Sequence, residues 1–185
     1  MTNSAPLQLI ERLLHDTIGL DFHSIGDHAI RAAVNIRMEA CDICEMQQYY
    51  SKLVSSADER HFLIEEVVIN ETWFFRDKKP FTYLANFCQK ILIDHPNKIL
   101  NILSAPCSTG EEAYSIAISL LNCGISETQY HIDAIDLSTK ALECAKVADY
   151  TQHSFRGQQD NDILEKYLTK TTTGYRVKEQ VKRNI

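Results

Sequence analysis

The chain lacks the features that mark several large classes of protein. Its formal charge is −6 over 185 residues, which argues against a general nucleic-acid binder. No apolar run approaches the length that spans a membrane, and the amino terminus has no charged-then-apolar leader. Because its six cysteines occur without such a leader, we expect reduced thiols in a cytoplasmic protein that does not insert into membranes.

Metal-ligand and phosphate-binding patterns are also scarce. Cys41 and Cys44 have the spacing of zinc ligands, but no second Cys or His pair lies at a suitable distance, so we expect no metal site. The small-residue stretch 104–110 contains one glycine, Gly110, and no Gly-Lys-Ser/Thr closes it. This pattern argues against a nucleoside triphosphate P-loop and against the three-glycine dinucleotide fingerprint.

The most informative stretch of the chain is Ile99–Leu120. Ile99–Leu103 is an apolar run of strand length, residues 104–110 form a turn of small residues, and an amphipathic helix is predicted from Glu111. Strand, turn and helix in this order open a doubly wound α/β domain, which binds ligands at the carboxyl end of the strand. Small residues let a ligand approach the backbone, and the N–H groups of the helix start face it.

Acidic residues at the start of the expected helix and after the second expected strand indicate which kinds of ligand the site can bind. Glu111 and Glu112 open the helix, where they would repel a pyrophosphate but suit a cationic group or a sugar hydroxyl. Asp136 follows a second predicted strand, Tyr130–Ile135, where a carboxylate can accept hydrogen bonds from a ribose diol. A nucleoside without phosphate and with a nearby positive charge describes S-adenosylmethionine. The alternative is that both glutamates only complement the helix dipole.

Four segments together resemble one protein family. NETWFFRD at 70–77, SAPCSTGEEAYSIA at 104–117, IDLSTKALECAK at 135–146 and SFRG at 154–157 are similar to the CheR family of chemotaxis receptor methyltransferases. The resemblance covers the chain from about Leu7 to its last residue. It implies transfer of a methyl group from S-adenosylmethionine to receptor glutamates, which yields glutamyl methyl esters and S-adenosylhomocysteine. The implied partner is the cytoplasmic region of chemotaxis receptors.

The resemblance also implies a set of cofactor contacts, although it names no catalytic residue in this chain. Arg76 would grip the carboxylate of the methionine group with its two-pronged guanidinium. The alternative for the segment around Arg76 is interdomain packing with an ordinary ion pair. The positions that match the cofactor contacts of the family are Asn70, Thr72, Arg76, Glu112 and Asp136.

The expected fold class is α/β, in two parts. Residues 1–78 are predicted to form a small all-helical domain, and residues 79–185 the first part of a Rossmann-like methyltransferase domain. In the family, a helix of the first domain is rich in Arg and Lys and docks on receptors. Here that helix offers only Arg31 and Arg37, which leaves docking residues and solvated arginines as alternatives.

The carboxyl-terminal strands of such a domain are not found in this sequence. Two parallel strands are predicted, with Tyr175–Lys178 as a third candidate, whereas the sheet of this class needs about seven. Three explanations stay open: a fragment of a longer chain, a sheet completed by a partner or by self-association, and a shortened protein without catalysis. The rival function is therefore a truncated, non-catalytic module that binds receptor or cofactor. A nicotinamide-dependent oxidoreductase is a weaker alternative, because the turn has a single glycine.

Overall fold

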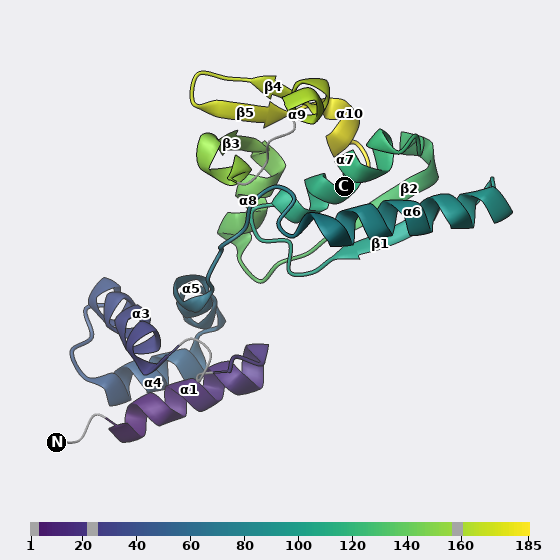
Figure 1. Cartoon of the computed structure of the whole chain (residues 1–185). Helices are drawn as coiled ribbons and strands as arrows, with labels where there is room; N and C mark the ends of the chain where they lie inside the picture. Colours follow the sequence, from purple (N-terminus) through teal and green to yellow (C-terminus); the bar gives the residue numbers. More distant parts are fainter. Residues whose placement is uncertain (1–3, 22–25, 157–160) are drawn as a thin grey trace. The chain divides into compact units, whose positions relative to one another are not determined.

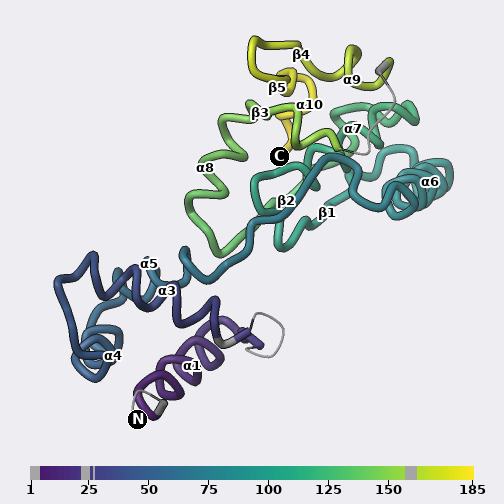
Figure 2. Tube along the Cα trace, turned by 60° about the vertical axis from the view of Figure 1, so that its left-hand side comes forward, coloured from purple at the N-terminus to yellow at the C-terminus, as the bar shows by residue number. Residues whose placement is uncertain are grey.

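The computed structural model describes residues 4–21, 26–156 and 161–185. The chain divides into two compact units, residues 1–69 and 70–185 (Figures 1 and 2). The helical domain predicted from the sequence, residues 1–78, includes residues 70–78, which belong to the second of these compact units. The reason is that Phe74 of this segment is buried in the hydrophobic core of the second unit.

The first unit is helical. Its most deeply buried side chains, such as Ile10, Val34 and Leu63, recur at helical spacing and form one hydrophobic core. Within this unit α1 packs on α4, and both α3 and α4 pack on α5. The helices described are α1 (Ser4–Ile18), α3 (Asp27–Ala40), α4 (Met46–Ser55) and α5 (Ala57–Val67).

A buried carboxylate, Glu59, links three elements of the first unit. Arg37 donates to both of its oxygens, at 3.0 and 2.9 Å, and the hydroxyl of Tyr49 donates at 3.0 Å. The thiol of Cys41 is 3.2 Å from the same carboxylate. Arg37 is therefore committed to an internal ion pair, and of the two arginines expected on this helix Arg31 is the exposed one.

The second unit opens with a parallel pair of strands flanked by helices, which confirms the expected α/β class. The two strands pair in register from Leu100 opposite Tyr130 to Ser104 opposite Ala134. Helix α7 packs against α6, α10 and β2 (Figure 1). The elements are α6 (Lys78–Asp94), β1 (Leu100–Ser104), α7 (Glu111–Asn122), β2 (Tyr130–Ala134) and α8 (Thr139–Val147).

A small antiparallel sheet follows, in the order β3-β5-β4. The sequence offered Tyr175–Lys178 as a possible third strand, and residues 175–177 contribute to β5, the centre of this separate sheet. Gly174 makes the pairing possible, because a Cβ there would lie 2.0 Å from the carbonyl oxygen of Tyr150. The elements are β3 (Asp149–Thr151), α9 (Asn161–Tyr167), β4 (Leu168–Lys170), β5 (Gly174–Val177), α10 (Glu179–Lys182) and the 3-10 helices η1 (Glu127–Gln129) and η2 (Gln152–Phe155).

The last residues of the chain reach the outer edge of β2. The backbone N–H of Ile132 donates to the carbonyl of Asn184 at 2.8 Å, and Arg183 forms an ion pair with Glu127 at 2.6 Å. The strand β2 thus has β1 on one side and residue 184 on the other. These contacts fix the position of β2, whose carboxyl end leads into the candidate site.

Candidate functional site

The turn between β1 and α7 has a backbone shape that few residues adopt. Ser108 has a φ of 48° and Gly110 a φ of 95°, both in the left-handed region. A Cβ on Gly110 would lie 2.8 Å from the Cβ of Ala145 and 3.0 Å from the hydroxyl of Tyr150. Glycine is therefore required at 110, and the turn is held closely against α8 and β3.

Asp136 fixes this turn to the end of β2. One oxygen of its carboxylate accepts from the backbone N–H of Ser108 at 2.7 Å, and the other from that of Ser138 at 2.9 Å. A carboxylate oxygen has two lone pairs, so each keeps capacity for one more donor. The residue is half-buried. Its position and spare acceptors match a contact to a pair of sugar hydroxyls.

The two glutamates that open α7 have different surroundings. Glu112 is exposed and accepts a hydrogen bond of 2.7 Å from the hydroxyl of Ser104, the last residue of β1. Glu111 is only 3% exposed, and its carboxylate accepts hydrogen bonds from the hydroxyls of Thr109 and Ser154. Of the two, Glu112 is the carboxylate that a ligand can reach.

Backbone hydrogen bonds bring the ends of the two parallel strands together. The carbonyl of Ser104 accepts from the N–H of Ile135 at 3.0 Å, and the carbonyl of Ile135 accepts from the N–H of Cys107 at 2.9 Å. Ser104 thereby contacts Glu112 through its hydroxyl and the residue before Asp136 through its carbonyl. The structure thus gathers two of the five expected site residues at one edge of the sheet.

The 70–77 segment is anchored to the α/β unit by its aromatic residues. The ring of Phe74 stacks on Phe155 at 4.6 Å and meets Tyr150 edge-on at 5.0 Å. Its backbone N–H donates to the carbonyl of Ser154 at 2.8 Å, and the N–H of the next residue, Phe75, donates to the hydroxyl of Ser115 at 2.9 Å. These contacts hold the segment beside the start of α7.

Arg76 lies over the aromatic ring of Trp73, with 4.6 Å from its guanidinium carbon to the ring centre. Its side chain is exposed and donates to the carbonyl of Glu71 at 3.2 Å, the one acceptor recorded for it among the described residues. The guanidinium therefore keeps N–H groups for a ligand carboxylate. Arg156 lies over the same ring at 4.2 Å and forms an ion pair with the side chain of Glu71.

The remaining two expected site residues have weaker structural support. Asn70 is exposed and Thr72 is half-buried. Within the described parts of the chain, no recorded hydrogen bond joins either of them to Arg76, Glu112 or Asp136. Their assignment continues to depend on the resemblance of the 70–77 segment.

A buried hydroxyl without a hydrogen-bond partner marks the same turn as a ligand site. The hydroxyl of Ser108 is enclosed and has no partner within the described residues. Buried polar atoms are rarely left unpaired, so this one fits a site whose ligand completes its hydrogen bonding. Together, the hydroxyl of Ser108 and the carboxylates of Asp136 and Glu112 suit a nucleoside with a cationic group.

Cys107 does not serve as a nucleophile in this turn. Burial, together with the negative charge of Asp136, raises the pKa of its thiol to about 11. The thiolate is the reactive form of cysteine, and little of it exists at neutral pH with such a pKa. Cys107 therefore fills space beside the turn.

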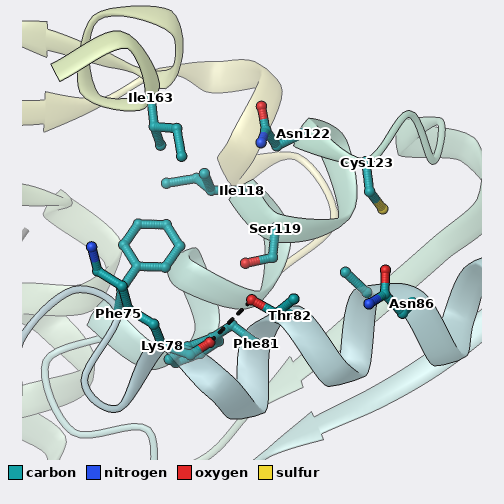
Figure 3. A pocket seen from close by; sticks show the side chains of 11 residues that line it. Phe75, Lys78, Phe81, Thr82, Asn86, Ile118, Ser119, Asn122, Cys123 and Ile163 are labelled. Atoms are coloured by element: carbon teal, nitrogen blue, oxygen red, sulfur yellow. Dashed lines mark hydrogen bonds between the residues drawn. The ribbon is translucent and has the colours of Figure 1, made fainter. Parts of the chain in front are cut away.

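A separate cavity of about 240 Å³ lies between α6 and α7 (Figure 3). Phe75, Ile118 and Ile163 form its apolar wall, while Thr82, whose hydroxyl donates to the carbonyl of Lys78, lies on the opposite side (Figure 3). None of the five expected cofactor residues lines it. The cavity is thus distinct from the edge of the sheet where Glu112 and Asp136 lie.

The described residues contain neither a candidate membrane span nor a candidate metal site. No described helix has both the length and the apolar character that crossing a bilayer requires. No group of three or more His, Cys, Asp or Glu side chains in the same residues is arranged to hold a metal ion.

Comparison with known proteins matches residues 70–185 to the family described as "CheR methyltransferase, SAM binding domain". The chain is 40% identical over 176 residues to a "Probable biofilm formation methyltransferase WspC" of Pseudomonas aeruginosa, which covers 95% of the chain and 42% of that relative. The WspC protein of Pseudomonas putida is 36% identical over 175 residues, which covers 94% and 41%.

A third relative is more distant. "Chemotaxis protein methyltransferase 2" of Pseudomonas aeruginosa is 28% identical over 144 residues, which covers 77% of the chain and 51% of that relative. The chain thus spans about two fifths to one half of the length of these curated relatives.

Proposed function

This chain belongs to the CheR methyltransferase family, and we propose that it binds S-adenosylmethionine at the edge formed by β1, β2 and the start of α7. The cofactor of the family is S-adenosylmethionine. The observation that carries the placement is a pair of carboxylates, that of Asp136 just after β2 and that of Glu112 in the first turn of α7, where Glu112 accepts from the last residue of β1. Ligands of such sheets bind at this edge.

Each residue of the proposed site has a defined task. Asp136 accepts hydrogen bonds from the ribose diol, and Glu112 faces the cationic part of the cofactor. Arg76 holds the carboxylate of the methionine group through its unused N–H groups. Asn70 and Thr72 add hydrogen bonds from the same segment, and the aromatic residues between them and Arg76 keep water from the site.

The reaction we propose is methylation of a glutamate side chain on a chemotaxis receptor. When bound, the cofactor supplies a methyl group on a sulfonium centre. The acceptor carboxylate is ionised at neutral pH, so the chain needs no strong general base. Its residues instead position the two reactants and exclude water, which are the effects that this kind of transfer requires. The relatives named as chemotaxis methyltransferases support this substrate class.

The proposed partner is the cytoplasmic region of a chemotaxis receptor, and the proposed location is the cytoplasm.

We also propose that a second copy of the chain can add to the sheet beside β1. Sedimentation velocity tests this self-association. A concentration-dependent dimer supports it, and a monomer throughout the concentration series contradicts it.

The activity is tested by transfer of a labelled methyl group. The chain is incubated with methyl-labelled S-adenosylmethionine and the cytoplasmic part of a receptor, and base-labile label on the receptor is measured. Label that disappears when the receptor glutamates are replaced by glutamine supports the proposal. A folded chain that binds S-adenosylhomocysteine yet transfers no label indicates the rival function, a non-catalytic binding module.

A further inference from the structure

Glu111 joins three parts of the second unit through one buried side chain. The hydroxyl of Thr109, in the turn after β1, donates to one of its oxygens at 2.6 Å, and the hydroxyl of Ser154, in η2, donates to the other at 3.0 Å. Its backbone carbonyl accepts from the hydroxyl of Ser115 at 2.6 Å. The carboxylate lies in the first turn of α7, where the helix dipole favours negative charge.

Two serines bonded to Glu111, Ser154 at its carboxylate and Ser115 at its backbone carbonyl, also hold the segment that carries Arg76. The carbonyl of Ser154 accepts the backbone N–H of Phe74, and the hydroxyl of Ser115 accepts that of Phe75. Two short chains of hydrogen bonds therefore run from Glu111 to successive residues of the 70–77 segment. A third connection runs from Glu111 through Thr109 to the turn that faces Asp136.

We propose that Glu111 is a positioning residue for the cofactor site: with Ser154, it sets the distance between the turn after β1 and the segment that bears Arg76. The inference rests on the proposed cofactor site and adds a residue to which the resemblance gave no cofactor contact. Arg76 and Asp136 would bind opposite ends of the same ligand, so a shift of one against the other weakens binding even where both side chains are intact.

The test removes one hydroxyl and leaves the fold's other contacts in place. In Ser154→Ala the backbone carbonyl still accepts from Phe74 and the ring of Phe155 still stacks, but the hydrogen bond to Glu111 is lost. Ser154→Thr restores a hydroxyl at the same position. Ser119→Ala is the matched control, because it removes a serine hydroxyl that bonds to a helix carbonyl of α7 without contact to Glu111.

Two readouts are measured on each variant. Acrylamide quenching of Trp73, the sole tryptophan of the chain, reports on the 70–77 segment without any ligand. Titration with S-adenosylhomocysteine gives the dissociation constant. We expect Ser154→Ala to increase the quenching constant and to weaken binding about fivefold or more, since a hydrogen bond to a charged group is lost. Ser154→Thr and Ser119→Ala should match the wild type. Glu111→Gln should move both readouts in the same direction as Ser154→Ala.

The outcomes separate this inference from the proposed function. Suppose that the wild-type chain binds S-adenosylhomocysteine. If Ser154→Ala then leaves either the quenching constant or the affinity unchanged, the positioning role is overturned. Failure of the threonine variant to restore both readouts also overturns it. If the folded wild-type chain binds no S-adenosylhomocysteine, the proposed cofactor site fails. The quenching data then decide whether Glu111 holds the segment: a change in Ser154→Ala supports this, and no change rejects it.

Discussion

The carboxylate of Asp136 accepts a hydrogen bond of 2.7 Å from the backbone N–H of Ser108, which joins the end of β2 to the turn that follows β1. This contact places an acidic side chain beside a turn of small residues and beside a hydroxyl that has no partner in the described chain. The proposed cofactor site is built around this contact.

Replacement of Asp136 by alanine should weaken binding of S-adenosylhomocysteine at least about tenfold, because hydrogen bonds from the ribose to a charged acceptor are lost. Isothermal titration calorimetry measures the change. Asp133→Ala is the matched control, since Asp133 lies on the exposed face of the same strand. Equal affinity of the Asp136 variant and the wild type contradicts the assignment.

Replacement of Arg76 by lysine should weaken binding of S-adenosylhomocysteine by about fivefold or more, because lysine keeps the charge but loses the two-pronged contact. Binding of 5′-methylthioadenosine, which lacks the amino-acid carboxylate, should not change. The control is Arg176→Lys, whose guanidinium bonds to Asp149 in the small antiparallel sheet. Equal losses for both ligands would show that Arg76 does not hold the carboxylate.

Cys107 should resist thiol reagents at pH 8. With a pKa of about 11, only about one in a thousand of its thiols is ionised at that pH, and the side chain is also buried. Cys144, which is exposed, is the internal comparison. Peptide mapping after brief alkylation should find the label on Cys144 and little on Cys107. Labelling of the two at equal rates is the opposing result.

The ion pair of Arg37 and Glu59 should stabilise the helical unit in a pH-dependent way. Burial opposes ionisation of Glu59, but hydrogen bonds from Arg37, Cys41 and Tyr49 outweigh it, so its pKa is lowered. The stabilisation is therefore present above the ordinary glutamate pKa of about 4.3 and is lost as the pH falls through the lower folded value.

Arg37→Met should lower the stability of the helical unit at pH 7 by about 3 kcal/mol, because it leaves a buried charge unpaired. Amide exchange of α3 and α5 in the intact chain measures the loss, and Glu59→Gln should flatten the acid dependence of this stability. Arg12→Met is the control, since its ion pair with Asp16 is exposed and should contribute little. Similar losses in Arg12→Met and Arg37→Met would contradict the buried role of Arg37.

The sequence predicted the parallel strand pair and the helix that begins at Glu111, because apolar runs, small residues and acidic residues follow one another there with clear local signals. It also separated Glu112 from Glu111 by resemblance, and the structure adds a physical reason: one is exposed and the other buried. Residues whose role depends on distant partners were missed. Ser154 contacts Glu111 across 43 positions of the chain, and no local pattern signals such a contact.

Two further differences between the predictions from sequence and the structure also come from contacts between residues that are far apart in the chain. Tyr175–Val177 has the composition of a strand in either sheet, and the close approach that Gly174 permits to Tyr150 assigns it to the antiparallel one. Arg37 could not be told from a docking residue by sequence, because its partner Glu59 lies in another helix.

The most direct test of the account is calorimetric titration of the 185-residue chain with S-adenosylhomocysteine. We expect one site per chain with micromolar affinity, weakened at least about tenfold in the Asp136 variant and unchanged in the Asp133 control. A chain that is folded by circular dichroism but releases no heat of binding at any ligand concentration, and shows no binding by equilibrium dialysis, contradicts a cofactor site formed by these residues.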